Sequence, residues 1–97
     1  QSLTNGGVIS ATLPITGFTT GTANSNANAA SLANATQGML KILYQKVETT
    51  SGQSTVITPA NLLGYSTITF AEVGDAVVLY FNGSNWVICG NVGGALA

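Results

Sequence analysis

Ionisable side chains are nearly absent from this chain of 97 residues, which contains two lysines, three carboxylates and no histidine or arginine. Charged residues make up 5% of the sequence, whereas an ordinary soluble domain carries about 25%. Histidine is the side chain most often used for acid–base catalysis and for binding transition metals. Because it is missing and the carboxylates are scattered, the sequence predicts no catalytic site, no metal centre and no enzyme activity.

Other absences exclude further classes of protein. No segment is basic enough for a nucleic-acid-binding groove, and no apolar run approaches the roughly 18 residues of a membrane-spanning helix. The glycines fall between predicted strands rather than before a helix, so no phosphate-binding loop and no cofactor is expected. Cys89 is the single cysteine, which rules out a disulfide within the chain. We expect its thiol to be a small buried hydrophobe.

What the chain does contain is apolar and uncharged polar residues. Hydrophobic residues make up 45% of it, and the formal net charge is −1. Little electrostatic repulsion therefore keeps copies apart. A surface supplied mainly by Thr, Ser, Asn and Gln suits close association with other subunits, and this composition predicts an assembly. The alternative is a monomer whose exterior is rich in hydroxyl and amide groups.

The strongest local signal is a β-hairpin near the C-terminus. Residues 76–81 and 85–89 are rich in β-branched and aromatic side chains, and they flank Asn82-Gly83-Ser84. Asn and Gly favour tight turns, so the two runs are predicted antiparallel neighbours. Both faces of the first run are apolar, because Val77 and Leu79 alternate with Val78 and Tyr80. We therefore expect this hairpin to be covered on both sides.

Turn signals recur about every eight to twelve residues, which is typical of all-β domains. The sequence predicts one domain over residues 1–97, a small antiparallel β-sandwich or barrel-like fold of about six to eight short strands. Residues 1–7 are expected to be an arm or a turn, and the arm could add a strand to a neighbouring subunit. Residues 8–13 are predicted to form a strand with Ile9 and Leu13 inward.

Two later segments differ in how clear their pattern is. The Ala/Asn-rich stretch 21–37 predicts an ordered loop or a short strand around residues 30–33, with a single helical turn as the alternative. Residues 38–48 predict a long strand. Leu40, Ile42 and Tyr44 share one face of it, while Lys41 and Gln45 interrupt the other.

Large apolar side chains are the candidates for packing or for subunit contacts: Tyr65, Phe70, Tyr80, Phe81, Trp86 and Leu96. Trp86, Tyr80 and Tyr65 could alternatively form a platform on which a sugar stacks, although packing is the favoured interpretation. Glu72 and Asp75 share a predicted turn, and carboxylates there usually bond to the turn backbone. Asn34 and Asn82 begin glycosylation acceptor patterns, but a hairpin turn explains the second.

Several short motifs, taken together, resemble a recurrent module of tailed-bacteriophage structural proteins. That module looks like TPANL, a TITF strand, a VGDSVTL strand, NG.NW and a final GN.GA. The matching residues here are Thr58-Pro59-Ala60-Asn61-Leu62, Thr67-Ile68-Thr69-Phe70, Val73-Gly74-Asp75-Ala76-Val77-Val78-Leu79, Asn82-Gly83-Ser84-Asn85-Trp86 and Gly90-Asn91-Val92-Gly93-Gly94, with Thr36-Gln37-Gly38 and Lys41 upstream. Ala76 stands where the module usually has Ser or Thr, and residues 21–34 do not match.

The resemblance implies a virion component without enzyme activity, commonly a homotrimer. The expected function is capsid decoration, in which a cement protein on the capsid exterior binds the major capsid protein or another virion protein and stabilises the shell. One alternative is the head of a fibre or spike that binds a host receptor or glycan. A second alternative is a subunit of a self-assembling extracellular filament.

Overall fold

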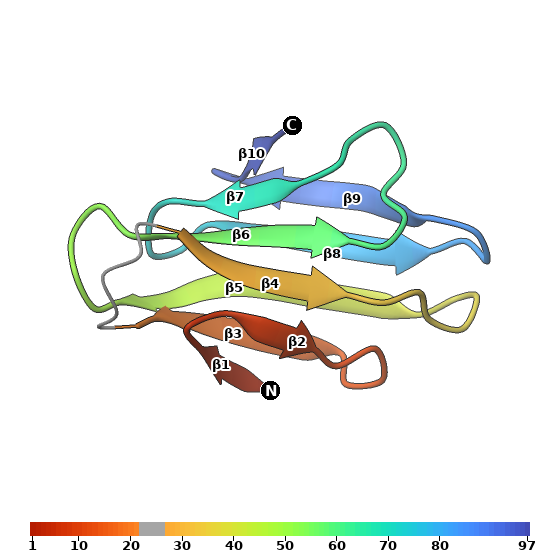
Figure 1. The fold of residues 1–97 in the computed structure, drawn as a ribbon. Coiled ribbons are helices and arrows are strands. Elements are labelled where there is room, and N and C mark those ends of the chain that lie inside the picture. The colour runs from red at the N-terminus through yellow and green to blue at the C-terminus, as the bar shows by residue number, and fades with distance from the viewer. Residues whose placement is uncertain (22–26) are drawn as a thin grey trace.

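A computed structural model describes residues 1–21 and 27–97, which form two β-sheets packed face to face (Figure 1). The first sheet has the strand order β1-β3-β5-β8-β9, and the second has the order β10-β7-β6-β4-β2. The strands are β1 (Ser2–Thr4), β2 (Gly7–Ile9), β3 (Ile15–Thr20), β4 (Ala27–Leu32), β5 (Leu40–Glu48), β6 (Ser54–Pro59), β7 (Ile68–Phe70), β8 (Ala76–Phe81), β9 (Trp86–Val92) and β10 (Ala95–Leu96).

The predicted all-β fold is confirmed, and it is a sandwich of two open sheets. The described residues hold more strands than the six to eight expected, because β1, β2, β7 and β10 are only two or three residues long. Strands this short leave little alternation in a sequence. The part of the chain that the structure describes includes no helix of a length and hydrophobicity that would cross a membrane.

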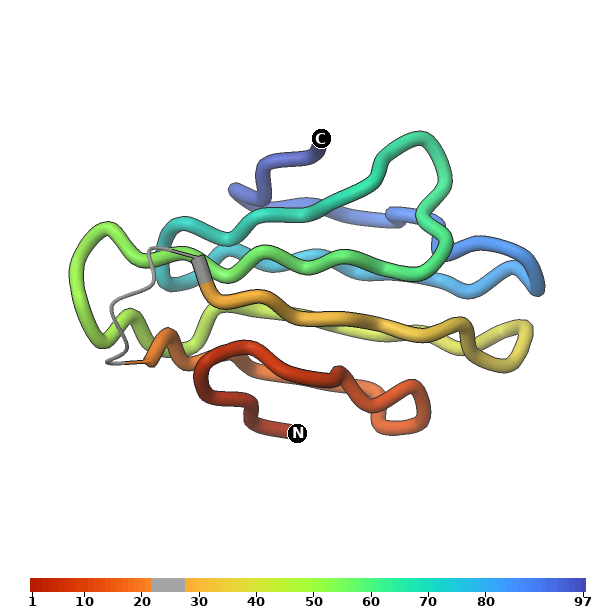
Figure 2. The backbone as a smooth tube through the Cα atoms, in the orientation of Figure 1, coloured from red at the N-terminus to blue at the C-terminus, as the bar shows by residue number. Residues whose placement is uncertain are grey.

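The N-terminal half of the sandwich is parallel, so the expectation of an antiparallel fold is wrong there. Successive strands from β1 to β6 alternate between the two sheets (Figure 2). Each strand from β3 to β6 therefore pairs in parallel with the strand two before it in the sequence. Ile15 of β3 is paired with Ile42 of β5, and Ala27 of β4 with Ser54 of β6. The remaining strands pair antiparallel.

The expected N-terminal arm lies within the sandwich of its own chain. Strand β1 pairs with β3, which leaves no free arm to add to a neighbour. The predicted turn is present, since Asn5, Gly6 and Gly7 all have positive φ. A Cβ on Gly6 would lie 2.0 Å from the carbonyl oxygen of Ala29. Only glycine therefore fits where this turn crosses β4.

The predicted C-terminal hairpin is confirmed as β8 and β9. Its turn is held by the Asn82 side chain, whose Oδ1 accepts from the N–H groups of Ser84 and Asn85 at 2.9 and 2.8 Å. The tail beyond it also pairs within the chain, because β10 lies antiparallel to β7. The N- and C-terminal ends of the described chain lie at opposite edges of the sandwich (Figure 1).

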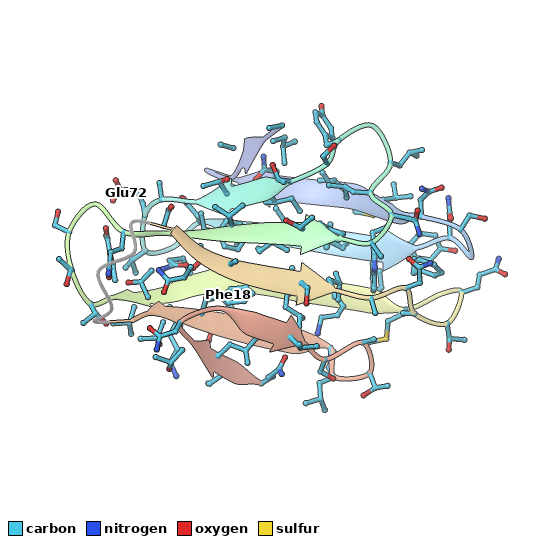
Figure 3. The ribbon with its side chains drawn as sticks, viewed as in Figure 1. Phe18 and Glu72 are labelled. Carbon is cyan, nitrogen blue, oxygen red and sulfur yellow. The ribbon has the colours of Figure 1, made fainter. Side chains whose placement is uncertain are left out.

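The core is the apolar layer between the two sheets. Phe18 of β3 and Phe70 of β7 meet across this layer with ring centroids 6.2 Å apart. Phe81 and Trp86 make an edge contact at 5.2 Å. Figure 3 shows Phe18 between the sheets and Glu72 at one end of the sandwich. The other core residues include Ile9, Leu32, Leu43, Ile57, Ile68, Val77 and Leu79, all almost fully buried.

Three sequence-based expectations fail or change in detail. Leu13 is 49% exposed in the loop after β2, because that strand ends at Ile9 instead of continuing inward. Cys89 is exposed, because β9 shifts register opposite Val78 and Leu79 and leaves this residue outside the regular alternation. The expected short strand in the Ala/Asn-rich stretch is β4, while the part of that prediction covering residues 22–26 lies outside the described residues.

Candidate interaction surface on the first sheet

The outer face of the first sheet is built from side chains that turn away from the core. Strand register places Leu40 opposite Tyr80, and Ile42 opposite Val78. The rows continue onto β9, where Val87 lies opposite Tyr80, and onto β3, where Ile15 lies opposite Ile42. We call the resulting surface the apolar face; it consists of Ile15, Leu40, Ile42, Tyr44, Ala76, Val78, Tyr80, Val87 and Val92.

Much of the apolar face is in contact with solvent. Leu40 is 57% exposed, Ile42 42%, Val78 37% and Val92 67%, whereas their strand neighbours Leu43, Val77 and Leu79 are buried. Single exposed apolar residues are ordinary on a protein surface, but a contiguous patch indicates an interaction site. The hairpin that the sequence predicts to be covered on both sides is thus covered by this chain on one side.

The second sheet provides an internal comparison, because hydroxyl-bearing and small side chains make up much of its outer face. Ser31 of β4 lies opposite Thr58 of β6, and Val56 of β6 lies opposite Thr69 of β7. Hydroxyl-bearing side chains on a solvent-facing sheet are the usual pattern for a sandwich. The two outer faces of the molecule therefore differ in character, and the first is the one suited to contact with another surface.

The nine residues of the apolar face carry no charge, but Lys46, which follows Tyr44 on the outward side of β5, is exposed on the same outer sheet face. Lys46 lies at its margin, where Nζ donates a hydrogen bond to Ser2 Oγ at 3.4 Å. The centre of the face is close packed: a Cβ on Gly17 would lie 2.8 Å from Cζ of Tyr44, so the Tyr44 ring lies directly over this glycine. The missing side chain at Gly17 keeps the Tyr44 ring flat against the sheet.

The opposite, inward face of β5 carries a buried lysine beneath the apolar face. Lys41 is fully buried, and its Nζ donates to the carbonyl oxygens of Ser10 and Leu13 at 2.6 Å each and to Thr16 Oγ1 at 3.1 Å. Burial lowers the pKa of Lys41 below its ordinary value, because the charged form loses hydration. Since no carboxylate is among these partners, Lys41 connects the loop after β2 to β5 and is not part of an acid–base pair.

Asp75 and Glu72 behave as turn residues. Oδ2 of Asp75 accepts from the N–H groups of Ala71 and Glu72 at 3.0 Å each, and Asp75 is 8% exposed. Glu72 is exposed at the end of the sandwich. Across residues 1–21 and 27–97, no cluster of three or more His, Cys, Asp or Glu side chains is placed to hold a metal ion.

The six residues predicted for packing or interfaces lie in different places. Phe70, Phe81 and Trp86 are core residues, and Trp86 Nε1 donates to the carbonyl oxygen of Ala33 at 3.0 Å. Leu96 is partly buried against the core. Tyr80 lies on the apolar face, and Tyr65 is 47% exposed in the loop between β6 and β7. Because Trp86 is fully buried, the sugar platform proposed for Trp86, Tyr80 and Tyr65 does not form.

Most of the apolar face was not among the predicted candidates, although its pattern is present in the sequence. The alternation of Leu40, Ile42 and Tyr44 with Lys41 and Gln45 separates the two faces of β5. A pattern that places polar residues on one face suggests that this face is exposed. In the structure the polar face is buried, so the apolar face is left outside.

No protein-family model matches this chain, and no curated protein matches it in sequence.

Proposed function

We propose that this chain is a non-enzymatic structural protein of a tailed-bacteriophage virion, acting as a trimeric capsid decoration (cement) protein. The observation that carries the proposal is the apolar face, a solvent-facing sheet surface of apolar residues with a single lysine, Lys46, at its margin. Such a surface supports contacts between subunits rather than chemistry on a small substrate. The motif resemblance of residues 32–97 supplies the virion setting.

The mechanism of a cement protein is mass action. A protein that binds the assembled shell, and not its separated subunits, lowers the free energy of the assembled state. At a free concentration 100 times the dissociation constant, this amounts to about 2.7 kcal/mol per site. The major capsid protein is the expected partner, and the low net charge of the decoration protein allows many copies to lie side by side on one shell.

The test uses particles that carry this chain, isolated with an antibody raised against the recombinant protein. Particles stripped of the protein should release their DNA at a lower temperature than intact ones, and adding the recombinant protein back should restore the original temperature. An equal melting temperature in all three samples would contradict the cement role. Bovine serum albumin at the same concentration controls for nonspecific stabilisation.

A second candidate function is the head of a fibre or spike that binds a host receptor or glycan. The loop between β6 and β7 favours it, because Leu63 and Tyr65 are 54% and 47% exposed within three residues of each other. Tyrosine on an exposed loop is a common contact for sugars and for proteins. Binding of the recombinant chain to host envelope fragments, lost in Tyr65→Ala and retained in Tyr44→Ala, would favour this function over decoration.

A further inference from the structure

The apolar face has the chemistry expected of a contact between identical chains. We propose that copies of this chain associate through the outer face of the first sheet, with Ile42 and Val78 at the centre of the contact. The inference rests on the proposed function in that both require a multi-subunit assembly, and it identifies the surface that joins the subunits. Neither Ile42 nor Val78 was a predicted interface residue.

The dimensions of the face are of the right order for an interface. Four strands spaced about 4.8 Å apart, each with about six residues rising about 3.3 Å, give a flat area of roughly 400 Å². The largest apolar patch on a typical monomer covers about 300–600 Å² and is often functional. Val47 of β5, which is 43% exposed, adds to this surface, and stable complexes remove roughly 800 Å² per partner from water.

The charge pattern favours another copy of this chain over a different partner. A partner with a charged surface would need complementary charges on this face, and the one that the described strands provide, Lys46, lies at the margin. The formal net charge of −1 means that two copies scarcely repel each other. A closed ring of three copies can turn this face toward a common threefold axis, which brings Ile42 and Val78 of each copy near the same face of the other two.

Val78→Glu places a charge at the centre of the face, and Val8→Glu is its matched control. Val8 is 72% exposed on β2, the edge strand of the second sheet. The mass of each protein is measured by light scattering after gel filtration, over a 100-fold range of concentration. The fluorescence of the buried Trp86 reports whether each variant is folded.

The expected result is a wild-type assembly, with a trimer near 29 kDa, three times the 9.8 kDa of one chain. Val78→Glu should be a folded monomer, and Val8→Glu should keep the wild-type mass. The double variant Ile42→Thr, Val78→Thr should keep its fold if the Glu variant does not. It should raise the dissociation constant at least about tenfold, which corresponds to 1.4 kcal/mol.

Three results would overturn the inference: a monomeric wild-type chain, Val78→Glu and the double Thr variant both assembling like wild type, or dissociation caused by Val8→Glu alone. The shell-melting experiment is independent of these. A monomer that raises the melting temperature of stripped particles would leave the cement function intact and remove this interface. A trimer that fails to bind particles would leave this interface intact and remove the cement function.

Discussion

Replacing Trp86 with alanine should remove a large part of the free energy of unfolding of this domain. The indole ring is fully buried, contacts Phe81 edge to face, and donates through Nε1 to the carbonyl oxygen of Ala33. Truncating a buried Phe or Trp to alanine typically costs about 3–5 kcal/mol, because apolar contacts are lost and a cavity remains. Small domains have only about 5–15 kcal/mol of total stability.

A second variant separates the ring from its hydrogen bond. Trp86→Phe keeps an aromatic ring beside Phe81 but loses the donor to Ala33, and should cost about 1–2 kcal/mol. Tyr65→Ala, at a position that is 47% exposed, serves as the control and should change stability by no more than about 0.5 kcal/mol.

The assay is urea unfolding followed by far-UV circular dichroism, which does not depend on the tryptophan. All variants are measured at one protein concentration, because an assembly adds concentration-dependent stability. A loss below about 1 kcal/mol for Trp86→Ala would refute the reasoning, since a fully buried indole cannot be removed so cheaply. Equal losses for Trp86→Phe and Trp86→Ala would instead show that the hydrogen bond accounts for the effect.

Three further predictions concern Lys41, Asp75 and Cys89. Lys41→Met leaves the carbonyl groups of the loop after β2 without their donor and should cost about 1–2 kcal/mol at pH 7. In the wild type, the pKa of Lys41 is lower in the folded chain than in the unfolded chain, so the unfolded chain binds more protons between the lowered value and 10.5. The contribution of Lys41 to the free energy of unfolding therefore rises with pH across that window. Urea titrations at several alkaline pH values should show that the difference in free energy of unfolding between wild type and variant rises, and a falling difference would contradict this. Asp75→Asn should cost about 1–2 kcal/mol by thermal unfolding, because a neutral amide oxygen accepts more weakly than the carboxylate oxygen that both turn N–H groups share. A similar loss for the exposed control Glu72→Gln would point to net charge instead. Cys89 should react with a thiol reagent in folded Val78→Glu without denaturant, and a thiol that reacts only in urea would contradict its exposed position.

The parts of the fold that were predictable depend on interactions between neighbours in the sequence. The β8–β9 hairpin follows from Asn82-Gly83 between two β-rich runs, and alternation places Val77, Leu79 and Phe81 on one face. The turn role of Asp75 was also foreseen, since carboxylates at turns commonly accept from nearby backbone N–H groups.

The parts that were missed depend on contacts between distant segments. A turn that reverses a strand within one sheet and a turn that carries the chain to the other sheet use the same residues, so the parallel pairing of β3 with β5 left no local signal. Buried lysines are rare, and the acceptors of Lys41 come from a loop about 30 residues earlier in the chain. That burial turns the polar face of β5 inward, so polarity alone does not show that Leu40, Ile42 and Tyr44 lie on the exposed face.

The alternation of β1 to β6 between layers ties the two halves of the core to a single folding event. Ile15 of β3 pairs with Ile42 of β5, and the strand between them in the sequence, β4, belongs to the other sheet. Neither sheet can therefore complete its strand pairing while the other is still unpaired. Contacts between distant segments slow folding. A chain wound in this way gains resistance to partial opening at the cost of slower folding.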